Sequence, residues 1–301
     1  MIPPVPPSDC NAPDPSLPVP ASPEIFPEQA AAILRQDAAV EQQAKLRSRR
    51  AFVGLGLAGL AGALGWRWLL NTPPVGGLPG GLRKVLDANG QLATAYFKHT
   101  RLAPEFPKSR AENLRFNGKI GLSEGFEPAA WRLSVQGYAP GGVAHSAPRV
   151  QHFSLTDLQA LPRTEMTTEF KCIEGWSQIV TWAGVRMSDF LTRYPLATAS
   201  GQPVADPESP PADLAPYVSL ITPDEKYYVG LDIESALHPQ TLLCYEMNGA
   251  PLTIPHGAPL RLVTPLKYGI KHIKRIGAIA FINQRPADYW AELGYDWHAG
   301  H

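Results

Sequence analysis

The sequence predicts an α+β domain dominated by strands, preceded by an amino-terminal membrane or signal helix. The chain has 301 residues, of which 32 are proline and 26 are glycine, and only 18% are charged. This mixture suits short strands and turns better than a helical bundle. Beyond residue 105 most periodic segments alternate as strands do, and few are helical. An apolar run over 51–70 is close to the ~20 residues that span a bilayer.

Charge and cysteine content exclude several classes of protein. Lysine plus arginine and aspartate plus glutamate number 27 each, so no net charge favours a nucleic-acid partner. Cys10, Cys172 and Cys244 include no Cys-x-x-Cys pair, which excludes thioredoxin-type, zinc-ribbon and c-type haem motifs. Three cysteines are also too few to supply the four ligands of an ordinary iron–sulfur cluster. Any metal must therefore be held by few protein ligands.

Residues 1–47 are expected to lie outside the folded domain. Ten of the first 27 residues are proline, which predicts a disordered tail that includes Cys10. Residues 28–47 are rich in Ala, Gln and Glu with interspersed leucines, and they favour a surface helix.

Residues 48–70 resemble a twin-arginine export signal. Arg49 and Arg50 are followed by one spacer, by Phe52 and by a run of Gly, Ala and Leu. A plain membrane anchor with a basic inner flank is the alternative. Both interpretations place the rest of the chain on the periplasmic side of the inner membrane. Ala61-Gly62-Ala63 suits a cleavage site, whereas Trp66 and Trp68 suit a membrane interface and favour an anchor that is not cleaved.

The folded domain is predicted to occupy 105–301. Residues 71–104 are predicted to be a linker, because 71–81 are rich in proline and glycine. Ser154 is a predicted helix N-cap, and Asn248-Gly249 is a strong turn signal. The expected strands cover 129–137, 217–222, 226–231, 241–247, 260–264 and 273–282, and the expected short helices cover 155–161 and 187–191.

The stretch over 164–177 carries the most informative residue, Cys172. It begins as an alternating strand and turns at Gly175, so the thiol is expected at a pocket mouth instead of inside a packed sheet. A free cysteine is usually a small buried hydrophobe, and that role stays open here. The alternative is a thiolate that binds a soft metal. Cys244, between Leu243 and Tyr245 in a predicted strand, is expected to be a core thiol.

Two basic segments lie at predicted turns. His256 and Arg261 flank a turn at a strand entrance, and three lysines, a tyrosine and a histidine crowd the glycine turn at 267–274. Guanidinium groups, ammonium groups and backbone amides at a turn are what a phosphate monoester requires. A solvated basic loop is the alternative. Together with Cys172, the two segments favour a phosphorylated cofactor with a sulfur-coordinated metal.

Five runs of sequence carry a family resemblance. They are Lys-Cys-Ile-Glu-Gly-Trp-Ser at 171–177, Asn-Gly-Ala-Pro-Leu at 248–252, His-Gly-Ala-Pro-Leu-Arg at 256–261, Lys-Tyr-Gly-Ile-Lys-His-Ile-Lys at 267–274, and Arg-Pro, Tyr-Trp and Gly-Tyr-Asp-Trp within 285–297. In this order they resemble the sulfite-oxidase-fold molybdopterin oxidoreductases, most closely the catalytic subunits of periplasmic methionine-sulfoxide reductase systems. The resemblance covers roughly 105–298. It implies a strand-dominated, sulfite-oxidase-type molybdopterin-binding fold and a molybdenum–molybdopterin cofactor.

The resemblance also implies a set of site residues. Cys172 is expected to be the catalytic cysteine and the one protein ligand to molybdenum, beside the dithiolene sulfurs of the pterin. Glu174, Trp176 and Tyr268 are expected to line the pocket, with packing around the cofactor as their alternative role. The other expected cofactor contacts are Asn113, Phe116 and Asn117 in a first loop, then Thr222 and His256, and the phosphate-holding residues Arg261, His272, Ile273 and Lys274.

The implied function is oxygen-atom or two-electron transfer by a molybdopterin-dependent oxidoreductase outside the cytoplasm. Its substrate would be small or protein-bound, for example a sulfoxide, and a membrane haem b cytochrome or another separate carrier would exchange electrons with it. Two alternatives stay open, a membrane-tethered cofactor- or partner-binding module without turnover and a sulfite dehydrogenase. Against the latter, Ile-Glu-Gly-Trp-Ser at 173–177 replaces the Gly-Asn-Arg-Arg-like run that follows the cysteine of sulfite oxidases.

Overall fold

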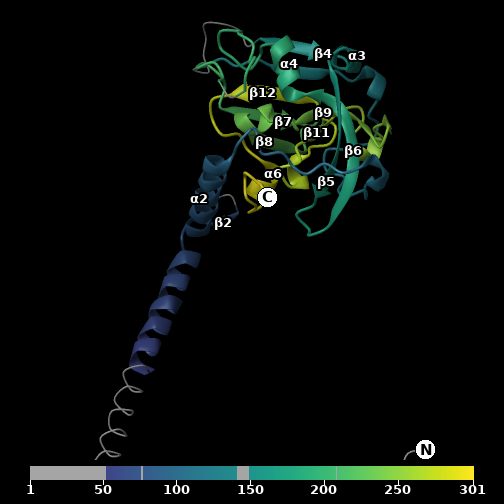
Figure 1. Ribbon diagram of the computed structural model, residues 1–301. Coiled ribbons are helices and arrows are strands. Elements are labelled where there is room, and N and C mark those ends of the chain that lie inside the picture. Colours follow the sequence, from purple (N-terminus) through teal and green to yellow (C-terminus); the bar gives the residue numbers. More distant parts are fainter. Residues whose placement is uncertain (1–51, 76, 141–148, 208) are drawn as a thin grey trace, which may run out of the picture. The chain divides into compact units, whose positions relative to one another are not determined.

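The computed structural model describes residues 52–75, 77–140, 149–207 and 209–301 (Figure 1). The chain divides into two compact units, Met1–Arg67 and Trp68–His301. The predicted tail, the predicted surface helix and the arginine pair lie outside the described residues. An apolar helix covers Phe52–Leu70 and is long and apolar enough to cross a membrane, criteria that a signal sequence also meets.

The region over 71–104 is structured, so its prediction as a linker was wrong. It contains a short hairpin, β1 (Pro74–Val75) and β2 (Leu78–Pro79), and a 17-residue helix, α2 (Gly80–Tyr96). The glycine and proline content serves the hairpin, because Gly77 has a φ of 72° and lies between its strands. Arg83 of α2 is buried and donates to the carbonyl oxygens of Ala291 (2.5 Å) and Tyr295 (3.2 Å), which ties the helix to the folded domain.

Two five-stranded sheets form the folded domain (Figure 1). One sheet has the order β10-β9-β6-β5, with β11 also paired to β9, and the other has the order β4-β3-β12-β7-β8. Pairing is antiparallel except between β3 and β12. The strands of the first sheet are β5 (Arg163–Lys171), β6 (Ser177–Arg186), β9 (Leu242–Met247), β10 (Ala250–Pro251) and β11 (Arg261–Val263). Those of the second are β3 (Leu133–Gln136), β4 (Val150–Phe153), β7 (Tyr217–Ile221), β8 (Tyr228–Asp232) and β12 (Ala278–Ile282).

The helices beyond α2 are short. They are α3 (Leu155–Gln159), α4 (Met187–Arg193), α5 (Ile233–Leu237) and α6 (Tyr289–Glu292), with 3₁₀ turns η1 (Lys108–Arg110), η2 (Pro128–Ala130), η3 (Ile254–His256) and η4 (Gly269–Lys271). The strand-dominated α+β class is therefore confirmed. The predicted cap is also confirmed, because Ser154 Oγ accepts from Asp157 N and Asp157 accepts from Ser154 N, a capping box.

Local signals located most strands correctly. Asn248 and Gly249 have φ values of 52° and 78° and join β9 to β10 through the tight turn that their sequence predicted. The last predicted strand was too long at its start, since β12 begins only at Ala278. Residues 273–277 precede this strand, and Ile273 and Ile276 among them are buried in the core.

Two hydrophobic clusters fill the domain. The larger joins both sheets and includes Leu133, Phe190 and Leu220. The smaller lies behind the β5–β6 hairpin and includes Trp182 and Cys244. Cys244 is buried as expected, and burial raises the pKa of its thiol to about 12.

Candidate functional site

Cys172 occupies the first position of the turn between β5 and β6. Its backbone N–H donates to the Trp176 carbonyl at 2.9 Å, and Gly175 N donates to the Cys172 carbonyl at 3.1 Å. Gly175 has a φ of 89°, a conformation that favours glycine, so this residue allows the turn to close. The result is a thiol at the end of the sheet that is 7% exposed.

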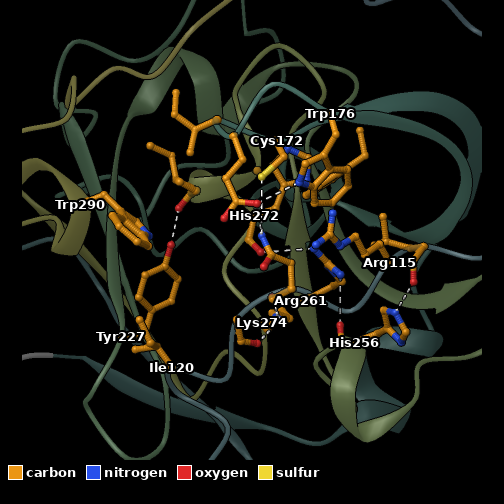
Figure 2. Close-up of a pocket in the computed structure, with 18 of the residues that line it drawn as sticks. Arg115, Ile120, Cys172, Trp176, Tyr227, His256, Arg261, His272, Lys274 and Trp290 are labelled. Atoms are coloured by element: carbon orange, nitrogen blue, oxygen red, sulfur yellow. Dashed lines mark hydrogen bonds between the residues drawn. The ribbon is translucent and has the colours of Figure 1, made fainter.

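The thiol faces a pocket that encloses about 860 Å³ of space, including the part open to solvent. Figure 2 shows Tyr227 and Trp290 across this pocket from Trp176. Its walls come from the loop before β3, the end of β5 and the β5–β6 turn, the β7–β8 turn, the segment between β9 and β12, and the region of α6. The lining residues are Leu114, Arg115, Asn117, Gly118, Ile120, Phe170, Cys172, Ile173, Glu174, Trp176, Tyr227, His256, Arg261, Gly269, Ile270, His272, Lys274, Trp290 and Tyr295.

Polar groups surround the sulfur. Asn117 Nδ2 lies 3.7 Å from Cys172 Sγ and donates to Glu174 Oε2 at 3.3 Å. Trp176 Nε1 donates to the same carboxylate oxygen at 3.0 Å. Burial raises the pKa of the Cys172 thiol, whereas the hydrogen bonds from Trp176 and Asn117 lower the pKa of Glu174. The Cys172 thiol therefore requires a positively charged partner, such as a metal ion, to become a thiolate.

His256 is held as a neutral imidazole. Its Nε2 lies 3.0 Å from the Leu114 carbonyl, and its Nδ1 lies 2.8 Å from Thr253 Oγ1. Because a carbonyl oxygen only accepts, Nε2 carries the proton and Nδ1 accepts from the hydroxyl. Burial lowers the pKa of His256, in keeping with this neutral form.

Arg261 is buried with few partners. Its Nη1 and Nη2 donate to the carbonyl oxygens of His256 (3.2 Å) and His272 (3.3 Å), and its guanidinium lies 4.8 Å from the Trp182 ring centre. Nε has no hydrogen-bond partner within the described part of the chain. Burial lowers the pKa of Arg261 to about 10, which still leaves it charged at neutral pH. This guanidinium is ready to bind an anion.

Lys274 and His272 complete the basic end of the pocket. Lys274 Nζ donates to the carbonyl oxygens of Asn117 (2.6 Å) and Gly118 (2.7 Å), and burial lowers its pKa to about 8. His272 Nε2 lies 3.0 Å from the Thr264 carbonyl, whereas its buried Nδ1 has no partner among the residues described. Burial lowers the pKa of His272 to about 3, so the ring is neutral.

Six of the ten predicted site residues line this pocket, namely Asn117, Cys172, His256, Arg261, His272 and Lys274. The other four do not. Asn113 is exposed. Phe116 lies under the Lys274 ammonium group, and Lys274 Nζ is 4.9 Å from the Phe116 ring centre. Thr222 closes its own turn, because its Oγ1 accepts from Tyr227 N at 3.1 Å, and Ile273 is in the core. Glu174 and Trp176 line the pocket, whereas Tyr268 packs on His301.

Several lining residues were not identified from the sequence. Arg115 and Ile120 come from the loop before β3, and Tyr227 is fixed by a hydrogen bond from its hydroxyl to the Ile270 carbonyl at 2.5 Å. The aromatic pair at 289–290 belongs to the closing run of the resemblance, which was a signal for Trp290. Nothing in the local sequence distinguishes Tyr227 from its neighbour Tyr228, the first residue of β8.

The residues present fit a phosphorylated, sulfur-coordinated metal cofactor. Cys172 offers one soft ligand at the pocket, and Arg261 Nε and His272 Nδ1 are buried polar atoms that lack a partner in the described chain. Buried polar atoms of this kind normally find a partner, so their lack of one points to a ligand. The pocket is therefore suited to bind an anionic metal cofactor.

Comparison with known families identifies the class. A family model described as the oxidoreductase molybdopterin binding domain matches residues 120–290, and the chain belongs to this family. It is therefore a molybdopterin-dependent oxidoreductase with a molybdenum–molybdopterin cofactor.

Individual relatives narrow the comparison. The "Putative protein-methionine-sulfoxide reductase subunit YedZ1" of Azospira oryzae is 34% identical over 208 residues, which cover 68% of this chain and 70% of that protein. The protein-methionine-sulfoxide reductase catalytic subunit MsrP of Xanthomonas campestris is 39% identical over 45% of this chain and 42% of its own length. MsrP of Ralstonia nicotianae is 29% identical over 62% of this chain and 52% of its own length. The chain thus spans about half of these catalytic subunits.

One solved structure resembles the domain more distantly. The sulfane dehydrogenase SoxCD from Paracoccus pantotrophus matches with a TM-score of 0.42 and 18% identity, over 62% of this chain and 46% of that one.

Proposed function

We propose that this protein reduces sulfoxide-type substrates at a molybdenum–molybdopterin centre outside the cytoplasm. The observation that carries the proposal is the position of Cys172, a thiol in the same pocket as two buried nitrogens without a partner in the described chain, the donor Arg261 Nε and the acceptor His272 Nδ1. The names of the MsrP relatives, which are 39% and 29% identical to this chain, support a sulfoxide as the substrate.

Each group in the pocket has a distinct task in this proposal. Cys172 binds the metal, and Asn117 donates toward its sulfur. Arg261 and Lys274 hold the pterin phosphate at the basic end, and His272 Nδ1 accepts a hydrogen bond from the cofactor. Neutral His256 positions the loop that carries Leu114. When bound, the cofactor supplies oxygen-atom transfer and two-electron oxidation and reduction.

The reaction requires electrons and protons from outside the pocket. A sulfoxide takes up two electrons and two protons and yields a sulfide and water. The full sequence has three cysteines and no Cys-x-x-Cys motif, so an iron–sulfur cluster or a c-type haem of its own is not supported. We therefore propose that a separate one-electron carrier, a membrane haem b cytochrome, supplies the electrons.

The location of the protein follows from the amino-terminal segment in this proposal. The apolar helix Phe52–Leu70 suits either a signal or an anchor, and the preceding arginine pair favours twin-arginine export. An anchor would hold the domain beside a membrane carrier. The relatives' names call them subunits, which agrees with a partner protein.

Metal content and sulfoxide turnover test this function. Protein exported by its native host should contain about one molybdenum and one pterin per chain, and it should reduce methyl p-tolyl sulfoxide with a reduced viologen dye. Cys172→Ser should lose the activity. Cys244→Ser, which changes a thiol outside the pocket, should keep both metal and activity. Wild-type protein without molybdenum would overturn the proposal.

A further inference from the structure

Helix α2 directs its polar side toward the folded domain. Arg83 is buried and donates to backbone carbonyls of the domain, and Asp87 pairs with Arg285 at 3.0 Å. Gly90 is also buried, at a point where a Cβ would collide with the ring of His298. Positions 83, 87 and 90 share one face of a helix. The face of α2 that contacts the domain is therefore polar or lacks a side chain.

The opposite face of α2 is apolar and exposed. Val85, Leu92 and Tyr96 are 54%, 58% and 74% exposed, and Ala88 between them is exposed as well. These four positions follow the spacing i, i+3, i+7 and i+11, so they form one continuous line, the apolar stripe of α2. A surface helix of a domain in water normally has the reverse arrangement, with its apolar side against the core. The arrangement of α2 therefore suits an apolar medium outside the domain.

The first turn of α2 is fixed to the end of the apolar helix Phe52–Leu70. Thr72 Oγ1 donates to the Leu69 carbonyl at 2.7 Å and accepts from Gly81 N at 3.1 Å. A Cβ on Gly81 would lie 3.2 Å from Leu69 Cγ, so the two turns are in close contact. All three residues belong to the same compact unit, Trp68–His301. Because Phe52–Leu70 is long and apolar enough to cross a membrane, this junction would lie at the membrane surface.

We propose that α2 lies on the membrane surface, with its apolar stripe at the boundary between the lipid head groups and the acyl chains. An interfacial helix buries its apolar face by about 5–10 Å, and Tyr96 is a residue type that favours this depth. Phe52–Leu70 spans the membrane in this proposal, so the domain is held at two points and its orientation is fixed. The inference goes beyond the proposed function, because it concerns how the domain is held and requires no cofactor.

Photo-cross-linking to lipid tests this placement in the full chain. The protein is reconstituted in phosphatidylcholine vesicles that contain a phosphatidylcholine with a diazirine in its acyl chain, illuminated and digested with trypsin. Cleavage after Lys84 and Lys98 releases one peptide, 85–98, that contains the whole apolar stripe. Cleavage after arginine releases 51–67, which contains most of the spanning helix. We expect lipid adducts on both peptides.

A double variant, Val85→Glu with Leu92→Glu, places two charges on the apolar stripe. Adducts on 85–98 should fall at least about fivefold, because interfacial binding depends on the apolar area that is buried. Adducts on 51–67 should not change. Both replaced side chains are exposed and glutamate favours helices, so thermal unfolding in detergent and sulfoxide reduction with the viologen dye should match the wild type.

A matched control places a charge on an apolar surface residue far from α2. Strand β8 borders a pocket that it shares with α2, and β4 is the opposite edge of the same sheet. Val150→Glu, which changes an exposed apolar residue of β4, should therefore keep the wild-type adducts on 85–98.

Three results would overturn the proposal. Wild-type protein with adducts on 51–67 and none on 85–98 would show that lipid does not cover the apolar stripe, and would leave that face to a second copy or a partner subunit. Equal adducts in the double variant would show that labelling of 85–98 does not depend on the stripe. A mature protein recovered from its host without residues 52–70 would remove the spanning helix that places α2 at the membrane.

Discussion

Asn117 Nδ2 lies 3.7 Å from Cys172 Sγ, although the two residues are 55 positions apart in the sequence. The loop that carries Asn117 is in turn held by Lys274 Nζ, which donates to the carbonyl oxygens of Asn117 and Gly118. Three distant segments therefore meet beside the sulfur. A variant that disturbs any one of these segments should therefore change the position of the other two.

Arg261→Met should stabilise the cofactor-free protein and weaken its hold on the cofactor. The Arg261 side chain is 2% exposed and meets no carboxylate within 4.0 Å in the described ranges, so burying its charge is costly. We expect the free energy of unfolding of the apoprotein in urea to rise by about 1–3 kcal/mol. Pterin content of protein purified from the native host should fall severalfold.

Arg275→Met is the matched control for the cofactor measurement. Arg275 is as buried as Arg261, and its guanidinium lies 4.1 Å from the Phe126 ring centre, outside the pocket. Whatever its effect on stability, this variant should retain wild-type pterin content. Full pterin content in Arg261→Met would show that its guanidinium does not hold the phosphate.

Gly257→Ala should destabilise the protein where the end of η3 packs against Lys274 and Arg275. Gly257 has a φ of 99°, and a Cβ there would lie 2.8 Å from Lys274 Cβ and 2.9 Å from Arg275 N. The left-handed backbone costs about 1–2 kcal/mol for alanine, and the steric contact should add about 1–3 kcal/mol. Gly249→Ala, with a φ of 78° and no atom within 4 Å, should show the backbone cost alone. Equal losses in urea unfolding would contradict the steric account.

The buried, neutral ring of His238 should lower the free energy of unfolding of the protein in mild acid. The buried ring lies with Nε2 3.1 Å from the Arg101 carbonyl, and its Nδ1 accepts from Gln240 N at 3.2 Å, which fixes the neutral form. Burial lowers the pKa of His238 to about 4. Between this value and the ordinary pKa of about 6.5, the unfolded chain binds a proton that the folded chain does not. Stability therefore falls as pH falls through this window.

Urea unfolding at pH near 7.5 and near 5 measures this dependence. His238→Gln should lose about 2 kcal/mol less than the wild type between the two conditions, because it lacks this one depressed pKa. His152→Gln, which changes an exposed histidine of β4, should keep the wild-type dependence. A wild-type slope in His238→Gln would mean that other groups cause the acid sensitivity.

Features that depend on neighbouring residues could be predicted from the sequence. The turn at Asn248-Gly249 follows from backbone preference, and the Ser154 cap needs only a side chain three residues before its donor. The placement of Cys172 at a pocket required only a strand that ends and a glycine that turns the chain. These interactions act over a few residues, and therefore the sequence displays them directly.

Features that depend on distant contacts were missed. Helix α2 was taken for linker because its stability comes from the Arg83 contacts to Ala291 and Tyr295, more than 200 positions away. Tyr227 enters the pocket because the chain folds back onto Ile270. Such partners cannot be recognised from local patterns.

The buried pair formed by Lys271 and Asp288 should be the most sensitive polar contact of the domain. Lys271 Nζ lies 2.6 Å from Asp288 Oδ2, also donates to the Gly230 carbonyl at 2.9 Å, and is 4.6 Å from the Trp297 ring centre. Lys271→Met leaves a buried carboxylate without its cation. We expect a loss of about 3–5 kcal/mol in the free energy of unfolding.

The same substitution should reach the cofactor, because the pair joins two walls of the pocket. Lys271 ends η4, which contributes Gly269 and Ile270 to the pocket, and Asp288 is the N-cap of α6, which contributes Trp290. Loss of the pair should therefore lower pterin content together with stability.

Lys108→Ala is the control for this prediction, because it breaks a surface pair between Lys108 and Glu165 in which the lysine side chain is 71% exposed. It should lower the free energy of unfolding by less than about 1 kcal/mol and leave pterin content unchanged. Adding Asp288→Asn to Lys271→Met should recover part of the lost stability, since the uncompensated charge is then removed. If the double variant is no more stable than the single one, the cost lies in packing and not in the buried charge.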